Sequence, residues 1–252
     1  MPDDVRARFA PVAANYAVAK FHTSPERLRE VLELSDPQPT DIALDVATGT
    51  GNTALALAPF VRRVVGLDLT REMLDQARRL TKERSLANAE WVIGDACRLP
   101  FADERFDLYT VRAAPHHFHD FAAFLHEALR VLKPGKLGAF VDCAPPAEAR
   151  AVMHEVEVRR DPSHVRSLTV DEWTERLERA GFVVEDAQSR ELDWDFDDWM
   201  KNMAVEPALA ADLATVIESA EGEARNQLHP ERREGKLWHA YWHALIRARK
   251  PL

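Results

Sequence analysis

The chain has 252 residues, of which 46% are hydrophobic and 30% are charged, a composition that can supply the core of one large globular domain. The formal net charge of −9 argues against a general nucleic-acid binder, because phosphate neutralisation requires a surplus of Lys and Arg. The two cysteines, Cys97 and Cys143, are too few for a disulfide framework and lack metal-ligand spacing.

The N-terminus and the apolar runs carry no targeting or membrane signal. The start, Met1-Pro2-Asp3-Asp4, is acidic and lacks the basic and apolar regions of a signal peptide. No apolar run approaches the roughly 20 residues that a membrane-spanning helix needs. We therefore expect a cytoplasmic protein without a membrane span.

Helix and strand patterns alternate from residue 24 onward. Ser24 suits an N-cap, Pro25 the first helical position and Glu26 the positive end of the helix dipole. Amphipathic segments predict further helices over residues 53–60, 71–84 and 120–132. Short apolar runs between them predict strands over residues 42–46, 63–68, 91–93, 106–112, 137–143 and 182–187. This alternation predicts a parallel sheet covered by helices on both faces.

The last third of the chain is less regular. Thr169 and Glu172 form a capping box for a helix that Gly181 closes. Residues 193–235 contain aromatic-acidic and helical patterns without a strand signal, and the aromatic-rich segment 237–246 predicts a final strand. We expect one domain with an N-terminal helical cap, a core, a variable helical insertion and a final strand, over residues 1–40, 41–192, 193–235 and 236–252.

A glycine-containing loop follows the first predicted strand and opens a helix, which is where a doubly wound sheet binds its ligand. In this loop, residues 44–51, Gly49 and Gly51 allow the backbone to turn sharply and to approach a ligand closely. The pattern Gly49-x-Gly51-x-x-Ala54 also resembles the dinucleotide fingerprint. The loop alone therefore leaves both an adenosine-sulfonium ligand and a dinucleotide open.

Acidic residues end the next two predicted strands at the same edge of the sheet. Asp68 ends the second strand and can accept hydrogen bonds from both hydroxyls of a ribose. Gly94-Asp95 ends the third, where a carboxylate can accept a hydrogen bond from an adenine amino group. This edge is the predicted nucleoside-binding site.

Several stretches resemble the class I S-adenosylmethionine methyltransferases, specifically the branch that includes the ubiquinone/menaquinone-biosynthesis C-methyltransferases. The matching stretches are LDVATGTGNTA (44–54), GLDLTREML (66–74), GDACRLPF (94–101), FDLYTVRAAPHHF (106–118) and RVLKPG (130–135). The resemblance implies a Rossmann-like α/β fold with a seven-stranded, mostly parallel sheet, an antiparallel last strand and helices on both faces. It also implies S-adenosyl-L-methionine as cofactor, S-adenosyl-L-homocysteine as product and a small-molecule acceptor.

The resemblance implies roles for individual residues at this sheet edge. The residues implied for the methionine part of the cofactor are Asp45, Ala47, Gly49 and Gly51, with Thr48 and Gly94 in the same site. Asp68 would hold the ribose, with Leu69 and Met73 against the adenosine and Asp95 and Ala96 against the adenine. Arg112 would lie beside the methionine end. Phe9 and Tyr16 fall in a segment that in relatives closes over cofactor and substrate.

One position departs from the family pattern Asp-x-Gly-x-Gly-x-Gly. Ala47 stands in place of the first glycine. Because alanine is the smallest side chain after glycine, we expect the loop to tolerate it provided that the φ angle of Ala47 is negative.

Three histidines are candidate general bases. Methyl transfer from a sulfonium mainly requires that the acceptor be positioned, and a base helps where a carbon or oxygen acceptor must lose a proton. His116 and His117 follow the fourth strand, and His164 lies in a later stretch, 160–166, that the resemblance places at the substrate pocket. Histidine titrates near neutral pH, which suits a base, although such residues also commonly bond the backbone or cap a helix.

Two other clusters have more than one interpretation. His116, His117, His119 and Asp120 could suggest a metal, but consecutive histidines point in different directions and the resemblance implies no metal, so we expect none. An aromatic cluster could line an apolar acceptor site or pack in the core, and its members are Trp194, Phe196, Trp199 and Met200.

The sequence favours a small-molecule methyltransferase, with an aromatic or quinone-like acceptor suggested by family analogy alone. Two alternatives stay open. A nicotinamide-dependent oxidoreductase would leave Gly94-Asp95 and residues 130–135 unexplained, and a non-catalytic partner subunit would keep the fold and bind the cofactor without transferring methyl. The acceptor atom and a homodimer are also left open.

Overall fold

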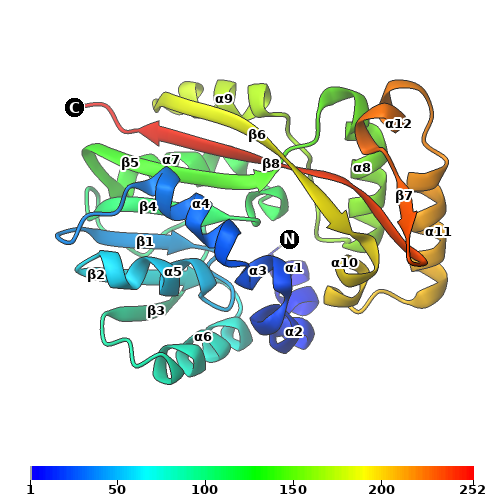
Figure 1. Cartoon of the computed structure of the whole chain (residues 1–252). Helices are drawn as coiled ribbons and strands as arrows, with labels where there is room; N and C mark the ends of the chain where they lie inside the picture. The colour runs from blue at the N-terminus through cyan, green and yellow to red at the C-terminus, as the bar shows by residue number, and fades with distance from the viewer. Residues whose placement is uncertain (1) are drawn as a thin grey trace.

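The computed structural model describes residues 2–252 and shows a mixed sheet with helices on both faces (Figure 1). The strands are β1 (Ile42–Val46), β2 (Arg63–Asp68), β3 (Ala89–Ile93), β4 (Phe106–Arg112), β5 (Leu132–Cys143), β6 (Val183–Asp195), β7 (Glu231–Arg233) and β8 (Lys236–Arg249). The helices are α1 (Pro2–Phe9), α2 (Ala13–Val18), α3 (Lys20–Thr23), α4 (Pro25–Ser35), α5 (Asn52–Leu57), α6 (Arg71–Glu83), α7 (Phe121–Val131), α8 (Ala147–Arg160), α9 (Val170–Arg179), α10 (Phe196–Asn202), α11 (Pro207–Glu218) and α12 (Gly222–Leu228).

The sheet confirms the expected mostly parallel topology with an antiparallel last strand, and it has eight strands where the resemblance implies seven, because β7 adds to β8. Its strand order is β3-β2-β1-β4-β5-β8-β6, with β7 paired to β8. Strands β1 to β5 pair in parallel, and β8 runs antiparallel to both β5 and β6. The carboxyl ends of β1, β2, β3 and β4 therefore lie along one edge, where the sequence predicts the nucleoside site.

Neighbouring residues of the strands face different helix layers because side chains alternate across a sheet. Ala43 packs with α5 residues such as Leu57 in one buried cluster. Leu44, the next residue of β1, packs with residues of α7 and α9, including Phe124 and Trp173, in another. The sheet is therefore buried on both faces, as the predicted alternation of strands and helices requires.

Local sequence signals start the helices as expected. The Ser24 hydroxyl accepts a hydrogen bond from the Arg27 backbone N–H at 3.4 Å, and α4 begins at Pro25. Thr169 and Glu172 form the predicted capping box of α9, with both reciprocal bonds present. The predicted helix over 53–60 instead divides into α5 and a 3-10 turn over Ala58–Phe60 that contains Pro59.

The region beyond residue 182 contains more strand than the sequence predicts. β6 extends to Asp195, and β7 occupies Glu231–Arg233, so the expectation of no strand over 193–235 is wrong at both ends of that range. Both segments pair with the long strand β8, and this pairing partner is supplied by the tertiary structure. Helices α8, α10, α11 and α12 pack against this half of the sheet and form a second layer (Figure 1).

Within the described residues, no helix combines the length and the apolar character required to span a membrane.

Candidate active site

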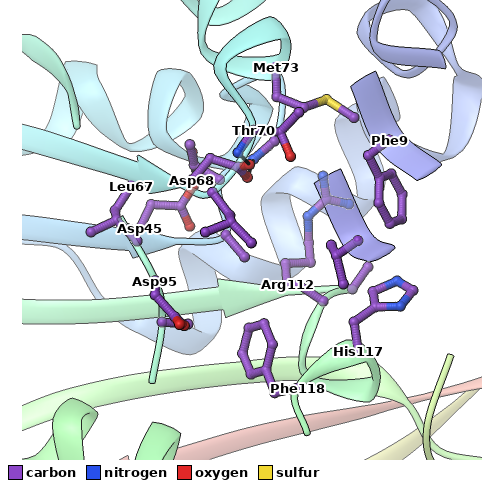
Figure 2. A pocket seen from close by; sticks show the side chains of 18 of the residues that line it. Phe9, Asp45, Leu67, Asp68, Thr70, Met73, Asp95, Arg112, His117 and Phe118 are labelled. Carbon is purple, nitrogen blue, oxygen red and sulfur yellow. Dashed lines mark hydrogen bonds between the residues drawn. The ribbon is translucent and has the colours of Figure 1, made fainter. Parts of the chain in front are cut away.

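A cavity of about 300 Å³ lies beyond the carboxyl ends of the first four strands. Figure 2 shows Leu67 and Asp95 toward one end of it, and Phe9 and His117 toward the other. The N-terminal helices close it, because Phe9 of α1 and Tyr16 of α2 belong to its lining. Lining residues among the predicted cofactor-binding set are Tyr16, Asp45, Ala47, Thr48, Gly49, Asp68, Leu69, Met73, Gly94, Asp95, Ala96 and Arg112. Gly51 is not part of this lining.

The glycine loop turns through left-handed backbone at three positions. Gly49 has φ +54° and Gly51 has φ +82°. A Cβ on Gly51 would lie 2.5 Å from the Trp91 ring, so the side chain of Trp91 can pack there only against glycine. A Cβ on Gly49 would meet nothing within 4 Å. Gly51 is therefore required for packing against Trp91, whereas Gly49 leaves the space between the loop and the cavity free of side-chain atoms.

Ala47 corrects an expectation from the sequence. Its φ angle is +49°, in the left-handed region, whereas we expected a negative φ angle, at which alanine is unstrained. An L-residue in this conformation brings Cβ close to backbone and is strained by about 1–2 kcal/mol. The alanine at the first glycine position of the family pattern therefore stands in strained backbone.

Asp45 organises the loop from inside the sheet. Its carboxylate accepts hydrogen bonds from the Thr48 hydroxyl at 2.5 Å and from the Thr110 hydroxyl at 2.7 Å. Burial raises the pKa of Asp45 to about 6, although the two hydroxyls and Arg112 favour the charged form. This carboxyl group ties β1, β4 and the loop together.

Asp68 connects the second strand to the same loop. One carboxylate oxygen accepts the Gly49 backbone N–H at 2.7 Å, and the other accepts the Thr70 backbone N–H at 2.8 Å. Burial raises the pKa of Asp68 above its ordinary value despite these bonds. Asp95 is anchored similarly, since Oδ1 accepts the Cys97 backbone N–H at 2.8 Å. Both carboxylates keep lone pairs for a ligand.

The guanidinium of Arg112 lines the cavity and is incompletely hydrogen-bonded. Its Nε donates to the Thr53 hydroxyl and its Nη2 to the His22 carbonyl, both at 3.0 Å. Nη1 is buried and has no hydrogen-bond partner among the described residues. Burial lowers the pKa of Arg112 to about 10. Because a buried guanidinium N–H is costly to leave unpaired, this geometry suits an anionic ligand group such as a carboxylate.

Comparison with known proteins identifies the family. A methyltransferase domain model matches residues 44–140. The chain is 30% identical over 220 residues to the uncharacterized methyltransferase YcgJ of Bacillus subtilis, covering 86% of this chain and 87% of that protein. The chain belongs to this methyltransferase family. The crystal structure of YcgJ matches it with a TM-score of 0.84 at 28% identity, over 90% of this chain and 99% of the other.

Two further relatives agree. The crystal structure of BH2331 from Bacillus halodurans C-125 matches the methyltransferase with a TM-score of 0.84 at 36% identity, over 90% of this chain and all of the other (100%). The demethylmenaquinone methyltransferase of Listeria monocytogenes serotype 4b is 31% identical over 151 residues, which cover 57% of this chain and 64% of that protein. Membership decides against the nicotinamide-dependent oxidoreductase.

As a class I methyltransferase, the enzyme uses S-adenosylmethionine, and the site fits this cofactor. The unpaired Nη1 of Arg112 suits the carboxylate of the methionine part. The lone pairs of Asp68 and Asp95 suit hydroxyl and amino donors of a nucleoside.

A second, smaller cavity of about 50 Å³ adjoins the cofactor cavity. The residues that line both cavities are Phe9, Tyr16, His22, Ala113 and His117. The other residues of the second cavity are Phe21, His116, Cys143, Arg160, Trp194, Trp199, Asn202, Tyr241 and His243. Trp194 and Trp199 line this cavity, and Phe196 and Met200 of the same predicted cluster pack in the buried core beside it.

His117 lies where the two cavities meet and is held by a short chain of hydrogen bonds. The Ser163 hydroxyl donates to Asp161 Oδ1 at 2.7 Å and lies 3.1 Å from His117 Nδ1. This arrangement assigns the proton to Nδ1 and leaves a lone pair on Nε2. Burial, reinforced by the neighbouring His116, lowers the pKa of His117 well below 6.5, so the ring is neutral at physiological pH.

The other two candidate histidines differ from His117. His116 Nδ1 lies 2.6 Å from Asp142 Oδ1; burial opposes the charged ring, but Asp142 outweighs it and raises the pKa of His116 well above 6.5. His164 is buried outside the lining of both cavities, and burial lowers its pKa to about 3. The structure thus brings His116 and His117 to the second cavity and places His164 behind it.

Sequence reasoning missed the residues that position His117. Asp161 and Ser163 lie in the stretch 160–166, which the resemblance places at the substrate pocket but in which only His164 is a candidate base. The Ser163 backbone N–H also donates to Asp161 Oδ1 at 3.0 Å, a turn typical of Asp-x-Ser. That local pattern is a signal for the turn, but the contact with a histidine 46 residues earlier depends on the fold.

Proposed function

We propose that the enzyme methylates, on carbon or oxygen, a small aromatic or quinone-like acceptor that binds in the second cavity, with His117 as the base. The observation that carries the proposal is the lining of that cavity, in which aromatic rings surround an unpaired Trp194 N–H and the Nε2 atom of His117. Trp194 stacks on Tyr241 with ring centroids 4.6 Å apart, and Phe21 packs edge-on against Trp194 at 4.7 Å. Flat apolar walls of this kind favour a flat ring.

Two polar atoms suit oxygen substituents on such a ring. The Trp194 Nε1–H is buried without a hydrogen-bond partner among the described residues, so it favours a ligand with an acceptor oxygen. The lone pair on His117 Nε2 favours a ligand hydroxyl that must lose its proton. A cavity of about 50 Å³ holds about four water-sized groups, so it favours a small acceptor over a large one. The demethylmenaquinone methyltransferases among the relatives support a quinone-like acceptor by analogy alone.

The proposed roles in cofactor binding follow the geometry. Arg112 pairs with the methionine carboxylate, Asp68 accepts from the ribose hydroxyls and Asp95 from the adenine amino group. Loop residues pack along the methionine part, and the apolar side chains of Leu69 and Met73 contact the adenosine. Phe9 and Tyr16 cover the junction of the cavities and exclude water.

The chemistry needs little more than alignment and one proton acceptor. When bound, S-adenosylmethionine supplies a sulfonium-activated methyl group. The second cavity holds the acceptor ring in one orientation, which converts an encounter into a positioned displacement. His117 takes the acceptor proton on Nε2, and Asp161 lies 4.0 Å from that atom, close enough to stabilise the resulting imidazolium.

The test is methyl transfer from labelled S-adenosylmethionine to single-ring phenols, catechols and short-chain hydroquinones, with aliphatic amines and thiols for comparison. We expect turnover only with the oxygenated rings. Trp194→Phe keeps an aromatic ring and removes the N–H, so it should raise the acceptor KM about tenfold while the S-adenosylhomocysteine Kd stays unchanged. Trp238→Phe, outside both cavities, is the matched control. Turnover of amines but not of phenols would overturn the proposal.

A further inference from the structure

A group of buried ligand-type side chains lies behind the second cavity. It joins Cys143 at the end of β5, Glu157 on α8 and His164 in the loop that follows α8. One ligand atom from each lies within 4.8 Å of the others. All three residues are buried, with exposed fractions of 4%, 2% and 3%. In a tetrahedral zinc site the ligand atoms are about 3.5 Å apart, so small side-chain adjustments would bring these three into range.

The ring of His164 has one nitrogen free to bind a metal ion. Its Nε2 lies 3.0 Å from the Ser167 hydroxyl, whereas Nδ1 is buried without a hydrogen-bond partner among the described residues. Metal-bound histidines typically have one ring nitrogen held by a neighbouring polar group and the other on the ion. An unpaired buried ring nitrogen is otherwise unfavourable.

A small cavity lies beside Cys143 and Glu157. This separate cavity of about 10 Å³ is lined by Cys143, Glu157 and Ser167, together with Pro145, Met153, Tyr241 and Trp242; His164 lies outside this lining, hydrogen-bonded to Ser167. That volume admits a single water molecule or ion. Because Cys143 also lines the second cavity, the position is adjacent to the proposed acceptor site.

The carboxylates near these three residues are each paired with a cation. Asp142, Glu157 and Asp161 are at most 2% exposed, and they face His116, Arg160 and Arg8, respectively. Arg160 Nη2 lies 3.1 Å from Glu157 Oε2, and the Tyr241 hydroxyl donates to Oε1 at 2.6 Å. Each carboxylate oxygen keeps a further lone pair for an ion.

We propose that Cys143, Glu157 and His164 bind a divalent transition-metal ion of the zinc type. A thiolate, an imidazole and a carboxylate form a ligand set that suits zinc, and three protein ligands leave a fourth position for solvent or an acceptor atom. On binding, the Cys143 S–H bond breaks, its proton goes to solvent and the sulfur electron pair bonds the metal. This proposal does not depend on which compound the enzyme methylates.

Nearby His116 and Asp142 are excluded as a joint pair of ligands. Their facing atoms are 2.6 Å apart, closer than two ligands on one tetrahedral ion. They therefore remain hydrogen-bonded to each other beside the metal position.

The test is titration of the full-length, metal-stripped protein with Co²⁺ and with Zn²⁺. We expect one ion per chain, a rise in Tm with Zn²⁺, and a thiolate-to-cobalt charge-transfer band with Co²⁺. The chain has two cysteines, so retention of the band in Cys97→Ser assigns the thiolate to Cys143 even if Cys143→Ser does not fold. His164→Gln should weaken Co²⁺ binding at least tenfold. A missing charge-transfer band, or undiminished binding in His164→Gln, would overturn the metal site and leave the methyltransferase proposal intact.

Discussion

The Asp68 carboxylate accepts the backbone N–H of Gly49 at 2.7 Å, which joins the residue proposed for the ribose to the loop proposed for the methionine part. The second oxygen of Asp68 accepts from Thr70. A single side chain therefore fixes the ends of two βα connections on the cofactor edge, and the loop conformation and nucleoside recognition are coupled.

Asp68→Asn should damage both functions of this residue. An amide has one acceptor oxygen, so one of the two backbone N–H groups loses its partner. We expect a loss of about 1–3 kcal/mol in the free energy of unfolding and at least a tenfold weaker S-adenosylhomocysteine Kd. Denaturant unfolding and calorimetric titration measure the two. Asp75→Asn, on the exposed face of α6, is the control and should change neither.

Ala47→Gly should stabilise the protein. Glycine adopts φ +49° without strain, which recovers about 1–2 kcal/mol, and the greater freedom of the unfolded chain offsets about 0.4–1 kcal/mol of this. The expected net gain is therefore of the order of 0.5–1 kcal/mol, measured as a higher urea midpoint with an unchanged m-value. A destabilised variant would mean that the Ala47 methyl group makes contacts worth more than its strain.

Gly51→Ala should be far more harmful than a similar change elsewhere. The new methyl group would overlap the Trp91 ring at 2.5 Å in backbone with φ +82°. Overpacking and strain together should cost about 2–5 kcal/mol. Gly222→Ala is the matched control, since its φ is +56° and a Cβ there meets nothing within 4 Å, so it carries the strain alone. Equal losses in Tm would contradict the packing role of Gly51.

Much of this arrangement could be predicted from the sequence because its signals are local. The alternation of apolar runs and amphipathic helices predicts the sheet, and Gly49, Asp68 and Asp95 mark the strand ends where the cavity lies. The φ angle of Ala47 could not be predicted, because the turn that imposes it depends on bonds from the second strand, such as Thr48 N–H to the Leu67 carbonyl.

The acceptor side was less predictable because its contacts are long-range. β6 extends to Asp195, where Leu192 and Trp194 alternate with acidic residues over only five positions, a strand pattern too short to decide without its pairing partner. Pairing with β8 forms this strand. The bond between Ser163 and His117 likewise joins segments that the fold brings together, and no pattern within either segment predicts it.

Asp45 should make stability depend on pH in an unusual direction. Its folded-state pKa is about 6, above the 3.8 of the unfolded chain, so between these values the folded state binds more protons. This group therefore contributes stability at low pH that is lost as the pH rises from about 4 to 6. Asp45→Asn cannot titrate, and the Thr48 and Thr110 hydroxyls can rotate to pair with its amide.

The measurement is the free energy of unfolding of wild type and Asp45→Asn at pH 4.5 and pH 7, without ligand. The difference in favour of the variant should grow by about 2 kcal/mol between these two pH values. Parallel pH profiles for the two proteins would show that Asp45 has the same pKa in both states.

Protonation of His117 should lower the rate of methyl transfer at acidic pH, which appears as an acid limb in the pH profile. Because burial and the neighbouring His116 lower its pKa well below 6.5, Nε2 is a free base throughout the neutral range. We expect kcat/KM for a phenolic acceptor to be flat near pH 7 and to fall only well below pH 6.5. His117→Gln should lower kcat about 10²–10⁴-fold and abolish that limb while S-adenosylhomocysteine still binds. His126→Gln, on the exposed face of α7, should leave the profile unchanged. If His117→Gln instead raised only the acceptor KM, His117 would be a positioning residue, because loss of a proton acceptor lowers kcat.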